Sequence, residues 1–376
     1  MSDKIVMLRG PERVRRRPAV MFGSDDIDGA MTALKMLLYI LAKEGVDGHS
    51  TQITVTQHQD GSIEIQDNGR GIYLGSPDRA DDTVWKELLC ELYAGPLYKD
   101  GVTTRCIFEG PSGKKGEYTD SLDICSVQYA SEYMDVCVIR DGFKQTLRFE
   151  KGYNIGGLRR TPCDELTGTY IHFKLDAEVF SDISLPKQQI ADTLQALAIQ
   201  IPRMKTAFRY ETPDGLEETE FYYPKGIADY LQEQNRGREA PSIYSAELTA
   251  EGRERYNKSQ YTASVKIAIC FAKDAGFIKC YHNLKELTYG GTHCDIANEA
   301  ICQRIEWMLG CKITKEDLQR HLQLILVTNS EITLWVNGAR TGIENVLIRD
   351  LTQDTIGDEF HYYVKLNKEF LRGLFC

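Results

Sequence analysis

The stretch Ser62–Ile72, SIEIQDNGRGI, joins an alternating strand directly to a carboxylate and two glycines. Upstream, TQITVTQ alternates in the same way, and Asp60-Gly61 between the two runs is a typical hairpin turn. We therefore predict a hairpin over residues 51–69. Asp67 followed by flexible glycine backbone suits the binding of a nucleotide base. Taken alone, however, Asp67-Asn68-Gly69 equally fits an ordinary turn after a strand.

The overall composition is typical of a soluble globular protein. The chain has 376 residues, of which 42% are hydrophobic and 27% charged, and this length allows two or three domains. A net charge of −10 argues against extensive binding of nucleic acid. The chain has neither the roughly 18-residue apolar run of a membrane helix nor an apolar signal segment at its start, so we expect a cytoplasmic protein without membrane contact.

The eleven cysteines form no CxxC pair and no Cys/His ligand spacing. An odd number of cysteines in a chain of this size is typical of a reducing compartment, where most are small buried thiols. We predict no metal site.

Hydrophobic periodicity predicts the other elements of the first half. A helix is expected over residues 28–45, with Asp28 as its cap, Gly45 past its end, and the apolar run 36–41 buried on nearly all sides. Further strands are expected over residues 134–142, 145–152 and 168–175. A helix is expected over 188–201, and a second hairpin over 204–223.

A polar stretch, residues 232–242, precedes a second half that mixes strands with a helix. This pattern predicts a smaller α+β domain with a strand–helix–strand crossover. The strands are expected over 264–272, 276–284, 321–329 and 332–338, and the helix over 295–309.

Four segments together resemble the ATPase region shared by the B subunits of DNA gyrase and topoisomerase IV, in order and spacing. The resemblance implies an α+β chain, in which a Bergerat-fold (GHKL) α/β sandwich over residues 1–222 precedes a smaller, ribosomal-S5-like transducer domain over 223–376. The segments are KIVMLRGPERVRRRPAVMFGS (4–24), QITVTQHQDGSIEIQDNGRGI (52–72), LTGTYIHFKLD (166–176) and NLKELTYGGTH (283–293).

The resemblance implies roles for five residues in binding an adenine nucleotide. Asp67 would accept the adenine amino group, because an ionised carboxylate is a pure acceptor. Gly69 and Gly71 would let the purine lie against the backbone, and Thr169 would hold the same edge through a water. Arg340 stands where the family has a lysine for the terminal phosphate, and it keeps the charge but not the geometry. Arg340 also fits an exposed cation in a turn.

The hydrolytic residues that the resemblance implies are replaced. The family's helix carries a glutamate that activates water and, four residues on, an asparagine that binds magnesium. Here Met36 and Ile40 stand at those places. A methionine cannot take a proton, and an isoleucine cannot ligate a cation that needs oxygen. The nearest acid is Glu44, two turns beyond Met36.

The phosphate lid implied by the resemblance is also altered. Its place is held by EYTDSLD, residues 117–123, which has no glycine and three acids that repel phosphate. Upstream, the glycine-rich GPSGKKG, residues 110–116, is either a displaced phosphate loop or a surface loop.

These observations predict a degenerate, catalytically inactive relative. It would be a nucleotide-pocket or regulatory module linked to type II topoisomerases, binding ATP or another adenine nucleotide weakly, with magnesium doubtful. The alternatives are an active ATP-driven clamp subunit that uses Glu44 or another acid, and a non-catalytic sensor of adenine ligands. The expected partner is a type II topoisomerase subunit or a second copy of the chain. We do not expect the Arg13–Arg17 cluster to contact DNA directly, and the end at Cys376 predicts no cleavage domain.

Overall fold

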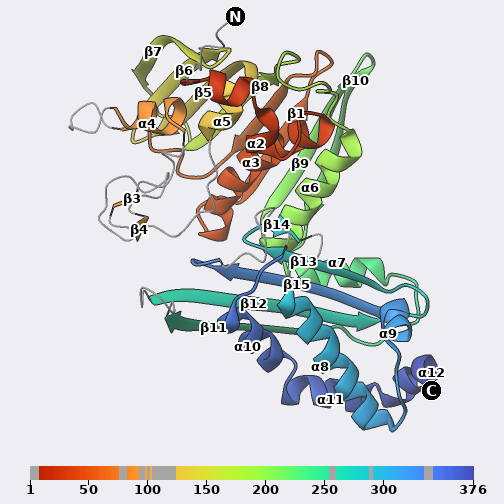
Figure 1. Cartoon of the computed structure of the whole chain (residues 1–376). Coiled ribbons are helices and arrows are strands. Elements are labelled where there is room, and N and C mark those ends of the chain that lie inside the picture. Colours follow the sequence, from red (N-terminus) through yellow and green to blue (C-terminus); the bar gives the residue numbers. More distant parts are fainter. Residues whose placement is uncertain are drawn as a thin grey trace, which may run out of the picture. The chain divides into compact units, whose positions relative to one another are not determined.

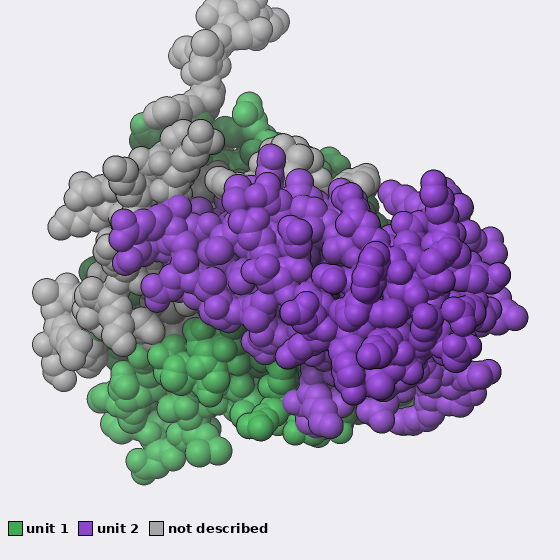
Figure 2. All heavy atoms as spheres, turned by 90° about the horizontal axis from the view of Figure 1, so that it is seen from below, with its two compact units in different colours: residues 1–222 green, residues 223–376 purple. Residues whose placement is uncertain are grey.

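The computed structural model describes most of the chain. The described residues are 8–75, 83–92, 98–99, 102–103, 124–253, 260–287, 291–333 and 342–376. They form two compact units, Met1–Tyr222 and Tyr223–Cys376, which Figure 2 colours separately. Arg340 and the segments 110–116 and 117–123 lie outside the described residues. None of the described helices is both long and apolar enough to cross a membrane.

Unit 1 is built on an eight-stranded sheet with the order β10-β9-β1-β2-β8-β5-β6-β7 (Figure 1). Neighbouring strands are antiparallel, except that β1 and β9 are parallel. The strands are β1 (Gln52–Gln57), β2 (Ile63–Asp67), β5 (Ser131–Arg140), β6 (Phe143–Glu150), β7 (Tyr153–Pro162), β8 (Gly168–Leu175), β9 (Lys205–Thr212) and β10 (Gly215–Tyr222), with a separate short pair β3 (Tyr98–Lys99) and β4 (Val102–Thr103).

Helices of unit 1 cover one face of this sheet (Figure 1), with α6 packed on β9 and β10 at one edge and α3 on the adjacent β1. Val55 lies opposite Ile65 in the β1–β2 ladder, and both are fully buried beneath the helices. Side chains alternate between faces along a strand, so every second residue of β1 and β2 points the same way. The helices are α1 (Glu12–Arg15), α2 (Pro18–Phe22), α3 (Ile27–Val46), α4 (Val84–Cys90), α5 (Ile124–Tyr129) and α6 (Lys187–Gln200).

The predicted helix over 28–45 is confirmed, but three details were wrong. The cap is Asp26, whose carboxylate accepts the Asp28 N–H at 3.0 Å, so Asp28 already lies in the first turn. Gly45 lies inside the last turn rather than beyond it. Met36 and Tyr39 are only half-buried. A run of six residues turns through more than a full circle, and a helix resting on a sheet buries only part of it.

The predicted hairpins over 51–69 and 204–223 are confirmed as β1–β2 and β9–β10, as are β5, β6, β8 and α6. The sequence analysis did not predict β7 or the short helices of unit 1. In β7, none of the ten residues is buried, so no alternation marks it as a strand.

Unit 2 contains a five-stranded sheet with the order β11-β12-β15-β13-β14. Strands β13 and β15 are parallel and are joined through helix α8, which confirms the predicted crossover. The predicted strand over 332–338 lies largely outside the described residues. The elements are α7 (Ile227–Gln234), β11 (Tyr244–Arg253), β12 (Gln260–Phe271), β13 (Phe277–His282), β14 (Lys285–Glu286), α8 (Thr292–Leu309), α9 (Lys315–His321), β15 (Leu322–Ser330), α10 (Val346–Thr355), α11 (Asp358–Leu366) and α12 (Lys368–Phe375).

Four of the cysteines form two disulfides, which the sequence analysis did not predict. Disulfides join Cys280 to Cys294 and Cys311 to Cys376. The partners are 14 and 65 residues apart, and only the packing of unit 2 brings them together. Spacing along the chain therefore carried no sign of either pair.

Candidate functional site

Asp67 ends β2 on the helix-covered face of the unit 1 sheet. It lies opposite Ile53 in the ladder, and only 4% of its surface is exposed. Thr169 in β8 is equally buried and points to the same face as Ile171, the partner of Ile65. The Ile72 N–H donates to the Thr169 hydroxyl at 3.2 Å. The structure therefore brings together Asp67, the glycine turn that follows it, and Thr169.

The two oxygens of the Asp67 carboxylate differ in their surroundings. Oδ1 accepts the Gly69 N–H at 2.6 Å, whereas Oδ2 is buried and accepts no hydrogen bond from the described residues. Burial, and then the nearby Glu44, raise the pKa of Asp67 to about 7, although the Gly69 N–H and Thr169 act in the opposite direction. A buried acceptor without a donor is costly, so this oxygen suits an incoming N–H group.

This raised pKa predicts how the stability of the protein depends on pH. Folding raises the pKa of Asp67 from 3.8 to about 7, so the folded state holds one proton more between these values. The resulting stabilisation is lost as pH rises through this range, by up to about 4 kcal/mol. We expect Asp67→Asn, which cannot ionise, to gain stability relative to wild type between pH 4 and pH 8. Urea unfolding at both pH values measures this gain, and parallel pH profiles for the two proteins would show that Asp67 does not titrate in this way.

The two glycines after Asp67 are needed for close packing within the turn. A Cβ on Gly69 would lie 2.8 Å from Asp67 Oδ1 and 3.0 Å from Glu44 Oε2. Gly71 has φ +80°, and a Cβ there would lie 2.8 Å from Val138 Cγ1. The turn is thus pressed against both the helix and the sheet, a reason for glycine that the sequence did not reveal.

Gly71→Ala is expected to destabilise unit 1 clearly more than Gly61→Ala. Gly61 has nearly the same φ, +81°, but no atom lies within 4 Å of its Cβ position. Each alanine carries the left-handed backbone cost of roughly 1–2 kcal/mol. Only Gly71→Ala adds overpacking, about 1–3 kcal/mol more. Urea midpoints of the two variants measure the difference, and equal losses would exclude the close packing around Gly71.

Glu44 is buried in an ion pair with Arg70 and is not open to solvent. Its side chain is fully buried, and its Oε1 lies 2.6 Å from Arg70 Nη2. Oε2 accepts the Arg70 backbone N–H at 2.9 Å, and Arg70 Nε lies within 3.2 Å of both oxygens. Both carboxylate oxygens therefore fasten the end of α3 to the turn after β2. The sequence analysis considered Glu44 as a water-activating acid and did not identify Arg70 as its partner.

Asn68 also has a structural role. Its Oδ1 accepts hydrogen bonds from the Ser50 hydroxyl and from the backbone N–H groups of Thr51 and Gln52, at 2.9–3.0 Å. Its Nδ2 donates to the Thr51 hydroxyl at 2.9 Å. Asn68 therefore ties the turn to the segment that enters β1.

Two arginines hold the chain after the turn. Arg140 Nη1 donates to the Gly71 carbonyl at 2.8 Å, and its guanidinium lies over the Tyr73 ring. Arg160 Nη2 donates to the Gly75 carbonyl at 3.3 Å. The sequence analysis missed both residues, since they come from β5 and β7 and no local pattern connects them to the turn.

Met36 and Ile40 precede Glu44 on α3 at intervals of four residues. Residues four apart are neighbours on one side of a helix, and Glu44 marks the side that contacts Gly69. Ile40 is 2% exposed and Met36 half-buried. This side of α3 therefore presents the thioether of Met36 two turns before the Glu44–Arg70 pair and the hydrocarbon side chain of Ile40 one turn before it.

The helix-covered sheet, with a carboxylate and a glycine turn at the end of β2, defines a Bergerat-fold (GHKL) sandwich followed by a smaller α+β domain. The family model described as DNA gyrase B matches residues 226–375. The DNA gyrase B subunit of Synechocystis sp. is 31% identical over 236 residues, which make up 61% of this chain and 21% of that protein. The DNA topoisomerase 4 B subunit of Bacillus subtilis is 29% identical over 300 residues, 78% of this chain and 42% of that protein. The chain thus spans less than half the length of these relatives.

Solved structures share the fold over nearly the whole chain. The B-subunit of the DNA gyrase from Myxococcus xanthus superimposes with a TM-score of 0.76 at 16% identity, covering 96% of this chain and 99% of that one. The 43K ATPase domain of Thermus thermophilus gyrase B, in complex with an aminocoumarin, superimposes with a TM-score of 0.70 at 20% identity. This superposition covers 97% of this chain and 92% of that one. The chain is therefore similar in sequence and in fold to the ATPase region shared by the B subunits of DNA gyrase and topoisomerase IV.

Proposed function

We propose that this chain binds an adenine nucleotide weakly through Asp67, does not hydrolyse it, and acts as a regulatory or binding module linked to type II topoisomerases. The observation that carries this proposal is a contrast within one site. Asp67 keeps a buried oxygen without a donor among the described residues, whereas the stripe of α3 that leads to it carries Met36 and Ile40. Relatives named as gyrase and topoisomerase subunits support the link to that class.

The proposed binding of the adenine base rests on hydrogen bonding. Adenine offers an exocyclic amino group, and Asp67 Oδ2 offers an acceptor within a buried setting. Supplying a donor there removes the penalty of an unsatisfied polar atom, which is about 1–3 kcal/mol. Thr169 lies close enough to lower the pKa of Asp67, and this proximity supports the proposal that it contacts the same edge of the base.

The proposed absence of ATP hydrolysis rests on the side chains that α3 carries. A general base contributes about 10²–10⁴ in rate, and magnesium requires oxygen ligands. Met36 and Ile40 supply neither function. Glu44 cannot replace the base while both of its oxygens are held by Arg70, and this weakens the alternative of an active ATP-driven clamp.

The site also agrees with a sensor of adenine ligands in general. Such a sensor would recognise the base through Asp67 and Thr169 and ignore the phosphates.

The proposed partner is a type II topoisomerase subunit or a second copy of this chain. The net charge of −10 gives no support to extensive DNA binding by the chain alone.

Calorimetry with adenosine, ADP and ATP, each with and without magnesium, tests the proposal. We expect the three ligands to bind with similar affinity and magnesium to have no effect. Asp67→Ala should weaken each ligand at least about tenfold, since it removes the acceptor proposed for the adenine amino group. A strong preference for magnesium-ATP, or unchanged binding to Asp67→Ala, would contradict the proposed use of the site.

A further inference from the structure

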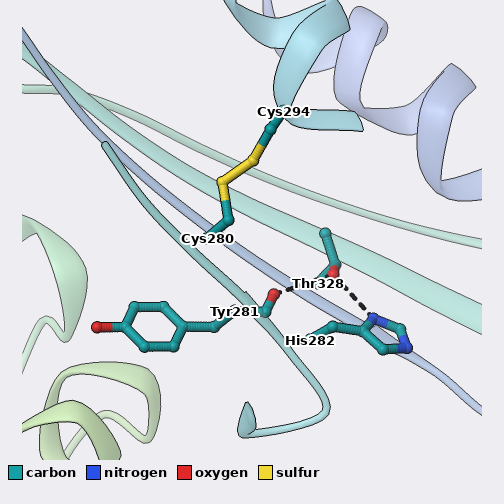
Figure 3. The surroundings of a disulfide bond; sticks show 5 residues. All are labelled: Cys280, Tyr281, His282, Cys294 and Thr328. Carbon is teal, nitrogen blue, oxygen red and sulfur yellow. Dashed lines mark hydrogen bonds between the residues drawn. A yellow bond between two sulfur atoms is a disulfide. The ribbon is translucent and has the colours of Figure 1, made fainter. Parts of the chain in front are cut away.

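A cluster of three side chains in unit 2 has the composition of a metal site. It consists of Cys280 from β13 and of His293 and Cys294 from the first turn of α8. Exposed fractions of 4%, 1% and 6% show that all three are buried. One ligand atom from each lies within 4.8 Å of the others. Figure 3 shows Cys280 and Cys294 meeting from the strand and the helix as a disulfide.

His293 is the unusual member of this cluster. Both of its ring nitrogens are buried, and neither has a hydrogen-bond partner in the described part of the chain. Nearby His282 differs, because its ring nitrogens pair with the hydroxyls of Thr328 at 2.9 Å and Thr333 at 2.8 Å, the first of which Figure 3 shows. A buried imidazole without partners costs free energy, so His293 requires an explanation.

We propose that Cys280, His293 and Cys294 bind a zinc-class cation when the disulfide between the two cysteines is reduced. Two equivalents of a thiol reductant cleave the S–S bond, giving two cysteine thiols and one molecule of oxidised reductant. Uptake of the cation releases the two thiol protons. The product has two thiolates and one neutral imidazole nitrogen on the metal, and the His293 nitrogen gains the partner that it lacks among the described residues.

The donor set selects the class of ion. Thiolate sulfur and imidazole nitrogen are the ligands of zinc and chemically similar ions, whereas magnesium and calcium require oxygen. Three protein ligands leave the fourth position of a tetrahedral ion to a water or another small ligand. Both the disulfide and the metal-bound form would fasten the start of α8 to β13.

Cobalt(II) is a suitable probe, because cobalt bound by thiolates absorbs strongly in the near ultraviolet. The full chain is reduced with a phosphine, freed of the reductant without air, and titrated with Co²⁺. We expect one equivalent to bind with thiolate-to-cobalt absorption, Zn²⁺ to displace it, and the oxidised chain to show no such absorption. Reduced wild-type protein without this absorption would overturn the proposal, whatever the variants do.

Variants assign the ligands. Cys294→Ser and His293→Asn should each weaken Co²⁺ binding at least about 100-fold, and His293→Asn leaves both thiols in place if Cys294→Ser fails to fold. The matched control is the double variant Cys311→Ser/Cys376→Ser, which removes the other disulfide and should leave binding unchanged. Binding that survives His293→Asn, or that disappears only in the control, would refute this assignment.

Discussion

Arg70→Ala is expected to destabilise unit 1 by about 3–5 kcal/mol, because it leaves a fully buried carboxylate without its counter-charge. Glu44 has no exposed side-chain surface and receives its side-chain hydrogen bonds from the Arg70 guanidinium and backbone N–H. The backbone bond survives in the variant, but the charge on Glu44 remains uncompensated. Urea unfolding of wild type and variant at pH 7 measures the loss.

An exposed ion pair in the same unit provides the control. Lys205 pairs with Glu220 on neighbouring strands, with side chains 39% and 47% exposed. Lys205→Ala should cost less than about 1 kcal/mol, since solvent screens such pairs. Replacing both Glu44 and Arg70 by methionine should recover much of the loss, because no unpaired charge remains. A loss for Arg70→Ala no larger than that of Lys205→Ala would show that the Glu44–Arg70 pair does not fasten α3 to the turn.

The second large effect is expected in catalysis. Purified chain in magnesium-ATP should release phosphate more slowly than a gyrase B subunit that hydrolyses ATP, by a factor of at least about 10⁴. Loss of a general base alone costs about 10²–10⁴. Loss of a magnesium ligand further weakens the neutralisation of phosphate charge. Met36 and Ile40 offer no replacement for either function, and Glu44 is held by Arg70. Steady-state phosphate release by the two proteins under identical conditions gives the ratio.

The core of the fold was predictable because its signals are local. Alternation and Asp60-Gly61 predict the β1–β2 hairpin, and Gly168–Leu175 agrees residue for residue with the predicted strand. The α+β class and the resemblance to the gyrase B ATPase region were confirmed. Elements without such a signal were missed, among them β7, which buries none of its ten residues.

The contacts that explain the site were less predictable, since they depend on tertiary packing. Glu44 and Arg70 are 26 residues apart, and nothing in their spacing shows that they meet. The role predicted for Gly71, to let a purine lie against the backbone, stays a prediction, and the neighbours that leave no room for a side chain there come from two distant strands, Val138 of β5 and Gly168 of β8. The Cys280–Cys294 pair likewise depends on the packing of α8 against β13.

The central claim is that the purine half of an ATP pocket remains around Asp67, while the half that would split the triphosphate is replaced by Met36 and Ile40. Phosphate release by purified wild-type chain and by Asp67→Ala, both in magnesium-ATP, tests it most directly. We predict the same background rate for both proteins. Rapid release by wild type that disappears in Asp67→Ala would contradict the claim, because it would show a working ATPase that uses this pocket.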